Sequence, residues 1–245
     1  MNLLLSLKER MGKAIGAVIA GILMLLCGSL LAFVFSPMQA LEARHVDQLP
    51  PMDAGSVEAA AAGDELLLTG RLVDNPLQEE GGYVAYRMDE WVVTLPENDD
   101  ESDEADGDWK RVEQIVPALN LEVAGRIVRT LASHDARLSG ALAEELILSD
   151  AYDEAKYNGE WLPHGTLRLK GLLNGDLVTV WGKKGSVGDL LPEELYGGDR
   201  VDFVESKKEA AKGIFIGGIA LMLCAPVMVV GGIVGAIFSR RRRRF

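Results

Sequence analysis

Two long apolar runs dominate the pattern of hydrophobic and polar positions along this chain. Residues 14–35 carry no charged side chain over 22 positions, and residues 213–238 carry none over 26. A helix rises about 1.5 Å per residue, so roughly 20 apolar residues cross the hydrocarbon core of a bilayer, which is about 30 Å thick. The pattern therefore predicts two transmembrane helices, the first of them ended by Ser36-Pro37.

A cleavable signal peptide is the alternative interpretation of the first run. Met38-Gln39-Ala40 loosely fits the small-residue cleavage site of such peptides. The apolar core of a signal peptide is usually about 7 to 15 residues long, and this run is longer. Its length favours an uncleaved anchor.

Small residues recur along both runs at spacings that place them on one helix face. Stripes of this kind let two transmembrane helices approach closely, so we expect the runs to pair as an antiparallel hairpin. Pro226 lies inside the second run and is expected to cause only a mild kink. The expected packing positions are Gly21 and Gly28 in the first run and Gly213, Gly217, Gly231 and Gly235 in the second.

Between the runs, short apolar stretches with β-branched residues alternate with turn signals, which is the pattern of strands. Asn174-Gly175 is the strongest of these signals, because this dipeptide favours two-residue hairpins. The pattern predicts roughly seven to nine antiparallel strands. The expected strands include residues 65–73, 83–94, 109–116, 120–123, 126–131, 166–171, 177–182 and 200–204.

The predicted fold class is a membrane protein in which two transmembrane helices flank an antiparallel β-rich extramembrane domain. Residues 36–63 are expected to form a juxtamembrane segment, residues 64–205 the domain, and residues 206–212 a helical connector to the second span. Two stretches are ambiguous. Residues 142–158 fit a short helix or a long loop, and residues 188–195 fit a helical turn.

Charge sets the expected orientation, because basic residues beside a span mark its cytoplasmic side. Three basic residues lie within residues 1–13, whereas residues 36–212 contain 17 basic and 36 acidic side chains, a net charge of −19. Both termini are therefore expected in the cytoplasm, with the domain outside a prokaryotic cytoplasmic membrane. The basic residues in the tail, residues 239–245, are Arg240, Arg241, Arg242, Arg243 and Arg244.

The negative charge of the domain also limits its partners. A surface this acidic repels nucleic acid and anionic membranes, and it attracts cations or basic proteins. The expected partners are the lipid bilayer and a membrane or envelope protein, with a second copy of the chain as an alternative.

The sequence contains no catalytic or cofactor-binding motif that we recognise. Cys27 and Cys224 both fall inside the apolar runs, so the domain has no disulfide, and the three histidines stand in no metal-ligand spacing. We therefore expect no enzymatic activity and no cofactor. The alternative is an envelope hydrolase or a protease-associated factor that uses domain carboxylates such as Glu144, Glu145, Asp150 and Asp153.

One acidic stretch of the chain is a candidate for a cation site. Residues 97–108 include eight acidic side chains and no basic one, which is typical of a solvated loop. Residues 102–113, which overlap this stretch, partly fit the calcium-loop template, with Gly107 at the sixth position and Glu113 at the twelfth, but Ser102 stands in place of the first aspartate. So acidic a stretch matches the template by chance, and we expect no specific site. The weak candidate ligands are Glu104, Asp106, Asp108 and Glu113.

Three stretches of the chain resemble the GIDE family, also called the beside-a-membrane domain. They are Leu68 to Val73 with the aromatic stretch Gly82 to Arg87, then Gly175 to Gly182, and finally Asp202 to Glu209. The resemblance implies an extramembrane β-rich domain between two membrane spans, with a short strand before the second span. A fainter likeness, through the stretch around Gly70 and the glycine-rich first run, is to a family of membrane proteins with more spans.

Eukaryotic members of the resembled family are mitochondrial ubiquitin ligases, whose activity lies in a C-terminal RING with cysteine and histidine zinc ligands. This sequence holds no such set of ligands, so the resemblance does not imply ligase activity here. The sequence as a whole predicts a non-catalytic two-pass membrane protein whose outward-facing acidic domain binds or organises envelope partners.

Overall fold

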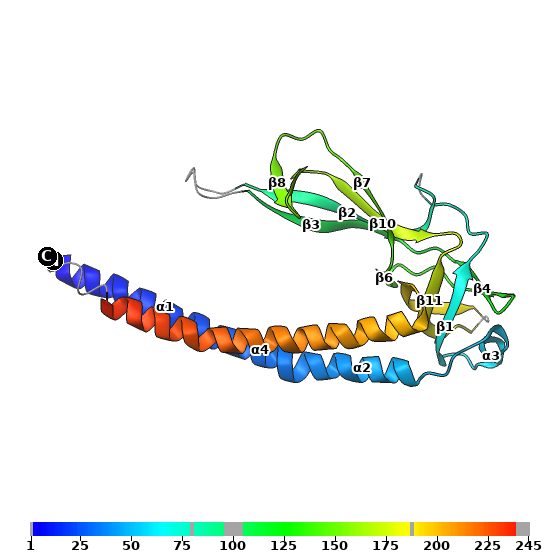
Figure 1. The fold of residues 1–245 in the computed structure, drawn as a ribbon, viewed down its shortest axis with the longest axis horizontal. Coiled ribbons are helices and arrows are strands. Elements are labelled where there is room, and N and C mark those ends of the chain that lie inside the picture. Colours follow the sequence, from blue (N-terminus) through cyan, green and yellow to red (C-terminus); the bar gives the residue numbers. More distant parts are fainter. Residues whose placement is uncertain (1, 79–80, 96–104, 187–188, 239–245) are drawn as a thin grey trace. The chain divides into compact units, whose positions relative to one another are not determined.

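The computed structural model describes residues 2–78, 81–95, 105–186 and 189–238 of the 245-residue chain (Figure 1). The chain divides into two compact units. Residues 1–48 and 204–245 form a helical unit, and residues 49–203 form a β-rich unit.

One continuous helix makes up the first part of the helical unit. α1 (Asn2–Leu30) passes through a π-helical turn, η1 (Leu31–Phe35), into α2 (Ser36–Gln48). The prediction that Ser36-Pro37 ends the helix is therefore wrong. A proline lacks the N–H that would bond the carbonyl four residues earlier, and its ring crowds that carbonyl. The wider π turn directly before Pro37 changes the local backbone pairing, which lets the helix continue.

The other helix of this unit, α4 (Arg200–Phe238), runs without interruption through Pro226. It begins where residues 200–204 were predicted to form a strand, so that prediction is also wrong. The reason is a helix cap, since the Asp199 carboxylate accepts a hydrogen bond from the N–H of Asp202 at 2.9 Å. The segments Ile15–Gln48 and Arg200–Gly232 are both long and apolar enough to cross a membrane.

Glycines let α1 and α4 approach each other as an antiparallel pair. A side chain on Gly28 would lie 2.7 Å from the carbonyl oxygen of Gly218, and one on Gly218 would lie 2.7 Å from the backbone nitrogen of Ala32. Gly21 faces Val229 in the same interface. Contacts this close between backbones require the absence of a side chain.

The glycine stripe expected on α4 does not face α1. Nothing lies within 4 Å of the position that a side chain would take on Gly213, Gly217 or Gly231, whereas Gly218 and Gly232 contact α1. Successive helix residues are turned by about 100°, so an error of one position moves a whole stripe out of an interface.

Polar contacts join α2 to the first part of α4. The Ser36 hydroxyl donates a hydrogen bond to the carbonyl of Ala211 at 3.0 Å, and the Lys207 ammonium pairs with the Glu42 carboxylate at 2.8 Å. The helix pair thus extends beyond its apolar part with its charges matched in the contact.

Sheet A of the β-rich unit has six strands in the order β5-β4-β1-β11-β12-β6. Its strands are β1 (Glu65–Leu72), β4 (Asn120–Val123), β5 (Arg126–Arg129), β6 (Arg137–Gly140), β11 (Leu177–Lys184) and β12 (Leu190–Gly197). All neighbours are antiparallel except β12 and β6, which run parallel. The helical turn predicted over residues 188–195 is wrong, because the residues at the start of β12 alternate between buried and exposed positions as a strand does.

Sheet B has four strands in the order β3-β2-β10-β7, and sheet C is the hairpin β8-β9. Their bounds are β2 (Tyr83–Thr94), β3 (Asp106–Ile115), β7 (Ala143–Ile147), β8 (Glu154–Tyr157), β9 (Glu160–Pro163) and β10 (Leu167–Leu173). Residues 142–158 therefore contain two strands and not the short helix or long loop predicted. The described residues hold twelve strands, more than the sequence pattern indicated.

The largest apolar cluster joins sheet A to one end of sheet B. Leu66, Val180 and Leu195 of sheet A are buried there with Ala85 of β2 and Leu172 of β10. The short helix α3 (Ala54–Ala59) packs on the same cluster. Burial of a large aliphatic side chain contributes roughly 1.5–3 kcal/mol, so this cluster is a main source of stability for the unit.

Candidate ligand-binding pocket

One face of sheet B carries charged side chains in its middle. Residues two apart on a strand share a face, so Arg87 and Asp89 of β2 lie with Arg168 and Lys170 of β10. The register places Arg87 opposite Lys170 and Asp89 opposite Arg168. Edge strands complete the two rows, which are Gln114, Arg87, Lys170 and Glu144 in the first and Arg111, Asp89, Arg168 and Leu146 in the second.

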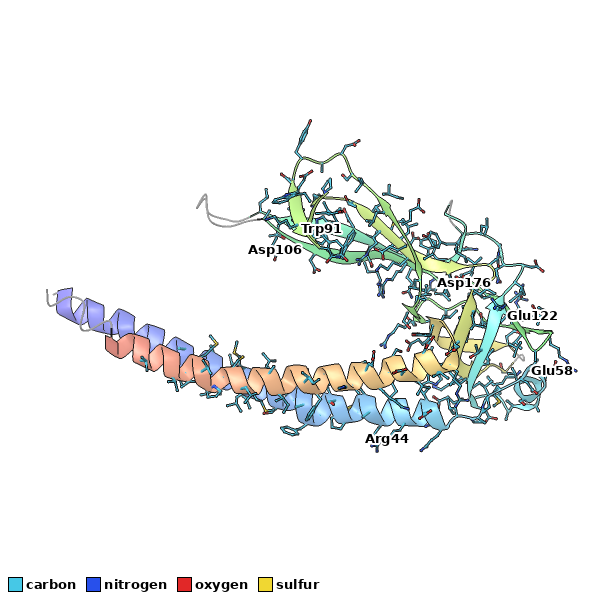
Figure 2. All side chains as sticks on the ribbon, viewed as in Figure 1. Arg44, Glu58, Trp91, Asp106, Glu122 and Asp176 are labelled. Atoms are coloured by element: carbon cyan, nitrogen blue, oxygen red, sulfur yellow. The ribbon has the colours of Figure 1, made fainter. Side chains whose placement is uncertain are left out.

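Apolar clusters border these rows at both ends. On the same face of β2, Ala85 precedes the charged residues and belongs to the main core, and Trp91 follows them (labelled in Figure 2). The Trp91 ring lies 5.1 Å from the ring of Trp109 and 5.4 Å from that of Tyr157. The charged rows are therefore held between two packed clusters.

A bulge in β3 brings Arg111 to this face. The register shifts so that Met88 lies opposite Glu113 while Asp89 lies opposite Arg111. Val112 is the additional residue. Without the bulge, Val112 would lie opposite Asp89, and Arg111 would point to the other face of the sheet. The bulge thus directs a cation toward the charged rows.

Asp89 and Arg168 form a buried ion pair. Arg168 donates to the Asp89 carboxylate at 3.0 Å and to the Tyr157 hydroxyl at 3.1 Å, and its guanidinium lies 4.1 Å over the Trp109 ring. The side chains of Arg168 and Asp89 are only 9% and 8% exposed. This arrangement holds the hairpin β8-β9 to sheet B, and its role is structural.

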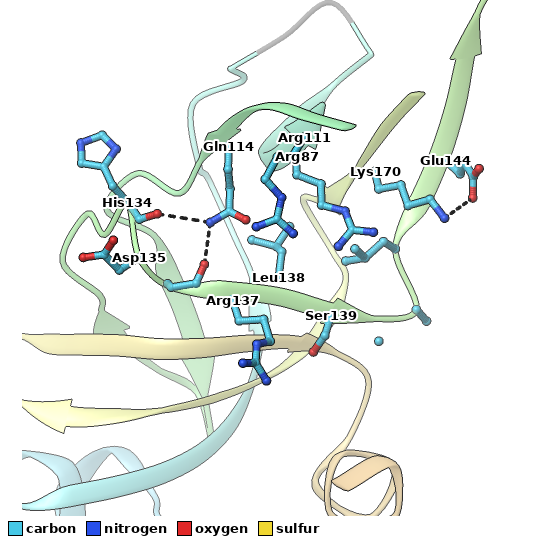
Figure 3. Close-up of a pocket in the computed structure, with 14 residues that line it drawn as sticks. Arg87, Arg111, Gln114, His134, Asp135, Arg137, Leu138, Ser139, Glu144 and Lys170 are labelled. Carbon is cyan, nitrogen blue, oxygen red and sulfur yellow. Dashed lines mark hydrogen bonds and ion pairs between the residues drawn. The ribbon is translucent and has the colours of Figure 1, made fainter. Parts of the chain in front are cut away.

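The row that contains Arg87 lines a pocket of about 770 Å³ within the β-rich unit. The facing wall is formed by residues 134–142, which include β6. Figure 3 shows Arg87 and Arg111 extending from sheet B toward this wall. The charged residues that line the pocket are Arg87, Arg111, Arg137, Lys170, Asp135 and Glu144.

Two of the lining cations have carboxylate partners nearby. The Arg87 Nε atom lies 3.5 Å from the Asp89 carboxylate, which Arg168 contacts more closely at 3.0 Å. The Lys170 ammonium pairs with Glu144 at 2.9 Å. The Asp89 carboxylate is therefore shared by Arg87 and Arg168. Of the cations that line the pocket, only Lys170 has a close carboxylate partner of its own.

The other two lining cations are less well compensated. Arg137 approaches Glu194 only to 4.0 Å, and among the described residues Arg111 has no carboxylate within ion-pair distance. Asp135 lines the pocket, but Figure 3 shows its carboxylate pointing away from the arginines. Five cations in and beside the pocket thus meet three close carboxylates, a surplus of two positive charges. The cations are Arg87, Arg111, Arg137, Arg168 and Lys170, and the carboxylates are Asp89, Glu144 and Glu194.

Gln114 ties sheet B to the facing wall. Its amide donates to the carbonyls of Ala136 at 2.7 Å and His134 at 3.4 Å, the dashed lines in Figure 3. The wall then turns at Gly140, whose φ of +84° is a left-handed conformation that glycine adopts at low cost. These features shape the pocket.

The chemistry that this pocket offers is recognition of anionic oxygens. A guanidinium is always charged at neutral pH, and its planar set of donors matches two oxygens of a carboxylate or phosphate. Arg87 and Lys170 are held by the sheet with side chains 24% and 23% exposed, so they present donors from a fixed floor.

Part of the opposite face of sheet B is apolar. Tyr83, Tyr86 and Leu169 form a buried cluster, with the two tyrosine rings 6.4 Å apart. Burial raises the pKa of the Tyr83 hydroxyl above its usual value of 10, and the negative charges of Glu145 and Glu144 raise it further. This cluster therefore stabilises the sheet on the face opposite the charged rows.

The carboxylates expected for catalysis are not gathered in the pocket. Glu144 and Glu145 are neighbours on β7, so their side chains point to opposite faces. Asp150 and Asp153 lie in the connection between β7 and β8. Of these four residues only Glu144 lines the pocket, where it pairs with Lys170.

The described candidates for metal binding lie in β3, whose first residues were predicted to be loop. The Asp106 carboxylate accepts from the N–H of Gly107 at 2.9 Å, and that of Glu113 accepts from the Tyr86 hydroxyl at 3.3 Å. Asp108 lies opposite Val92. The part of the chain that the structure describes contains no group of three or more potential metal ligands. Glu104, the arginines Arg240 to Arg244 and the surroundings of Gly235 fall outside the described residues.

Sequence reasoning did not single out Arg87 or Arg111. A signal for Arg87 was present, because Arg87-Met88-Asp89 and Arg168-Leu169-Lys170 both place charges on one face of a predicted strand. The bulge that turns Arg111 to this face has no comparable mark in the sequence.

Comparison of the chain with known protein families, curated proteins and solved structures gives no match. The case for function therefore depends on the pocket and the helices.

Proposed function

We propose that this chain is a non-catalytic two-pass membrane protein whose extramembrane domain binds an anionic group of an envelope component. The observation that carries the proposal is the surplus of positive charge at the pocket, with Arg111 unpaired among the described residues, in a segment of net charge −19. A local cluster of cations attracts an anion that the surrounding acidic surface repels.

The helical unit supports insertion into a membrane. Only 17% of the apolar window in Ile15–Gln48 is buried and only 11% of that in Arg200–Gly232, whereas a core helix of a soluble protein is mostly buried. Phe33, Leu223 and Val227 are 64%, 67% and 71% exposed. Lipid tails would cover these side chains, and the helices satisfy their own backbone hydrogen bonds as a bilayer requires.

The proposed orientation keeps both termini in the cytoplasm, with the β-rich unit outside a prokaryotic cytoplasmic membrane. It is supported by the basic flanks of the two spans in the sequence. A reporter that works only in the cytoplasm should be active after residue 245 and inactive when inserted after residue 103. The opposite result would place the pocket in the cytoplasm and refute an envelope ligand.

The pocket supports binding better than catalysis. Its one expected catalytic carboxylate, Glu144, is paired with Lys170, and a hydrolase would need a second acid or base beside it. The lining instead presents permanently charged arginines, which hold an anion but do not exchange protons at neutral pH.

The beside-a-membrane resemblance is a further part of the proposal. Its first two stretches fall on β1, β2 and β11, while Asp202 to Glu209 lies in α4, where the resemblance implies a short strand. The proposed likeness is therefore one of architecture, with an extramembrane β-rich domain between two spans.

Capture of partners by the full chain tests the binding function. Tagged wild-type chain, Arg111→Glu and Arg129→Glu would be cross-linked in the native membrane, purified in detergent and compared by quantitative mass spectrometry. Arg129 is an exposed residue of β5 outside the pocket, so its variant has the same change in charge. We expect one set of envelope components with the wild type and Arg129→Glu, and its loss with Arg111→Glu. Equal recovery by all three proteins would refute binding through the pocket.

A further inference from the structure

We infer that the pocket takes a phosphate monoester group, carried by a soluble phosphate ester or by a phospholipid whose headgroup is a phosphate monoester, such as phosphatidic acid. The inference rests on the proposed binding function of this pocket and specifies the chemical class of its ligand. Three properties of the pocket lead to it: charge, the directions of its donors, and size.

The charge of the pocket matches a dianion. The five cations in and beside it meet three carboxylates within 4.0 Å, an excess of two positive charges, and among the described residues Arg111 is the cation with no carboxylate within that distance. A phosphate monoester carries a charge of about −1.5 to −2 at pH 7. A single carboxylate carries one negative charge and would leave half of the surplus unmatched.

The cations that face the pocket come from sheet B. Arg87 and Arg111 come from neighbouring strands of sheet B, where they occupy successive rows of the same face. Arg137 lies in β6 on the facing wall, but its guanidinium lies toward Glu194, and Figure 3 shows it pointing away from Arg87 and Arg111. Arg87, Arg111 and Lys170 can together bond several oxygens of a tetrahedral phosphate, whereas one guanidinium already satisfies a planar carboxylate.

The size of the pocket indicates a phosphate on a larger molecule. Its volume of about 770 Å³ lies within the range of roughly 300–1,000 Å³ that is typical of sites for small organic ligands. A phosphate ion alone would fill a small part of it. A polyanion such as nucleic acid is excluded, because it would meet the acidic surface around the pocket.

The test is calorimetric titration of the full chain in phosphatidylcholine nanodiscs with glycerol 3-phosphate, inorganic phosphate, sulfate and acetate at constant ionic strength. We expect saturable binding of glycerol 3-phosphate and phosphate with a Kd of about 1 mM or tighter, and at most weak binding of acetate. Sulfate should bind comparably to phosphate, since it has the same shape and charge.

Arginine variants locate the binding in the pocket. Arg111→Gln should weaken phosphate binding about 10- to 100-fold, because it removes a charge-assisted hydrogen-bonding group. Arg111→Lys should lie between the wild type and Arg111→Gln, since it keeps the charge and loses the paired donors. Arg129→Gln should bind as the wild type does. Equal weakening by Arg129→Gln would show general attraction to surface charge and overturn the inference.

Replacing part of the phosphatidylcholine by phosphatidic acid distinguishes the two sources of the phosphate. A headgroup ligand would compete, so the apparent affinity for soluble phosphate would fall, and a soluble ligand would leave it unchanged. Both results support a phosphate site.

The titrations distinguish a wrong ligand class from a wrong function. If acetate binds as tightly as phosphate and Arg111→Gln abolishes both, the phosphate inference is wrong while the anion-binding function stands. If no anion binds saturably, the inference is wrong, and unchanged partner capture by Arg111→Glu would then remove the proposed function as well.

Discussion

The helical unit and the β-rich unit use their charged residues in different ways. Where α2 meets α4, Lys207 is paired with Glu42 at 2.8 Å, and Lys208 with Asp47 at the same distance. On sheet B, by contrast, Asp89 is shared by two arginines, and among the described residues Arg111 has no carboxylate within ion-pair distance. Charges in the helix pair complete an internal contact, whereas those at the pocket exceed what the fold can neutralise.

The same difference appears within one row of sheet B, which contains both Arg168 and Arg111. Arg168 is buried and engaged by Asp89, Tyr157 and Trp109, and Arg111 is exposed at the pocket. We therefore propose separate roles for two arginines on one sheet face, one in holding the fold and one in binding. This distinction predicts which substitutions change stability and which change binding.

The largest expected effect is on stability, from Arg168→Ala. The substitution leaves the Asp89 carboxylate buried without its closest partner, and loss of one member of a buried ion pair typically costs about 3–5 kcal/mol. Denaturation of the full chain in detergent, followed by tryptophan fluorescence, measures the free energy of unfolding, and Trp109 reports directly because it lies under the guanidinium. Arg129→Ala is the exposed control. A cost below about 1 kcal/mol, as for a surface pair, would contradict the claim that Asp89 and Arg168 form a buried stabilising pair.

The next largest effect is expected in the helix pair, where substitution of Gly218 should cost more stability than substitution of the adjacent Gly217. Gly218→Ile should destabilise the pair by about 1–3 kcal/mol, the usual cost of overpacking, because its side chain would press on Gly28 and Ala32. Gly217→Ile should be nearly neutral, since open space surrounds that position. Thermal unfolding in detergent compares the two variants. An equal loss in both, or a larger loss in Gly217→Ile, would contradict the observed interface.

A smaller effect is expected at alkaline pH and arises in the β-rich unit. Because burial and then Glu145 and Glu144 raise the pKa of Tyr83 above 10, the unfolded chain releases this proton first as the pH rises. The contribution of Tyr83 to stability is therefore fully present below pH 10 and falls as the pH increases through the folded-state pKa.

Unfolding free energies of the wild type and Tyr83→Phe, measured from about pH 9 to pH 11, test this dependence. The wild type should lose stability more steeply than Tyr83→Phe over this range, and Glu145→Gln should fall between them. Parallel curves for the wild type and Tyr83→Phe would show that the hydroxyl titrates alike in both states.

Local patterns in the sequence predicted much of the fold. The strand over residues 83–94 and that over residues 120–123 have the predicted bounds, because alternating apolar residues and clear turn signals define them. Predictions failed where one local sequence signal was followed but another local feature determined the structure. Pro37 was expected to end a helix that continues through a π turn, and the strand expected at residues 200–204 is a helix capped by Asp199.

The pocket was harder to predict than the strands, because it depends on contacts between distant segments. Lys170 and Glu144 meet only once β10 pairs with β7, and Arg111 reaches the pocket through a bulge. The facing wall requires β6 to join sheet A beside β12, a parallel pairing that no turn signal indicates. Alternation along single strands could have suggested the charged face, but not its partner wall.

Stabilisation of the full chain by phosphate is the most direct test of the distinction between Arg168 and Arg111. At a phosphate concentration ten times the Kd, binding should stabilise the wild type by about 1.4 kcal/mol, or roughly 3–6 °C in Tm. Arg111→Gln should unfold at the wild-type temperature without phosphate and gain little from it. Arg168→Gln should unfold well below the wild type and retain a gain from phosphate. The account would be contradicted if phosphate stabilised Arg111→Gln as much as the wild type, or if Arg111→Gln lowered the Tm without phosphate as much as Arg168→Gln does.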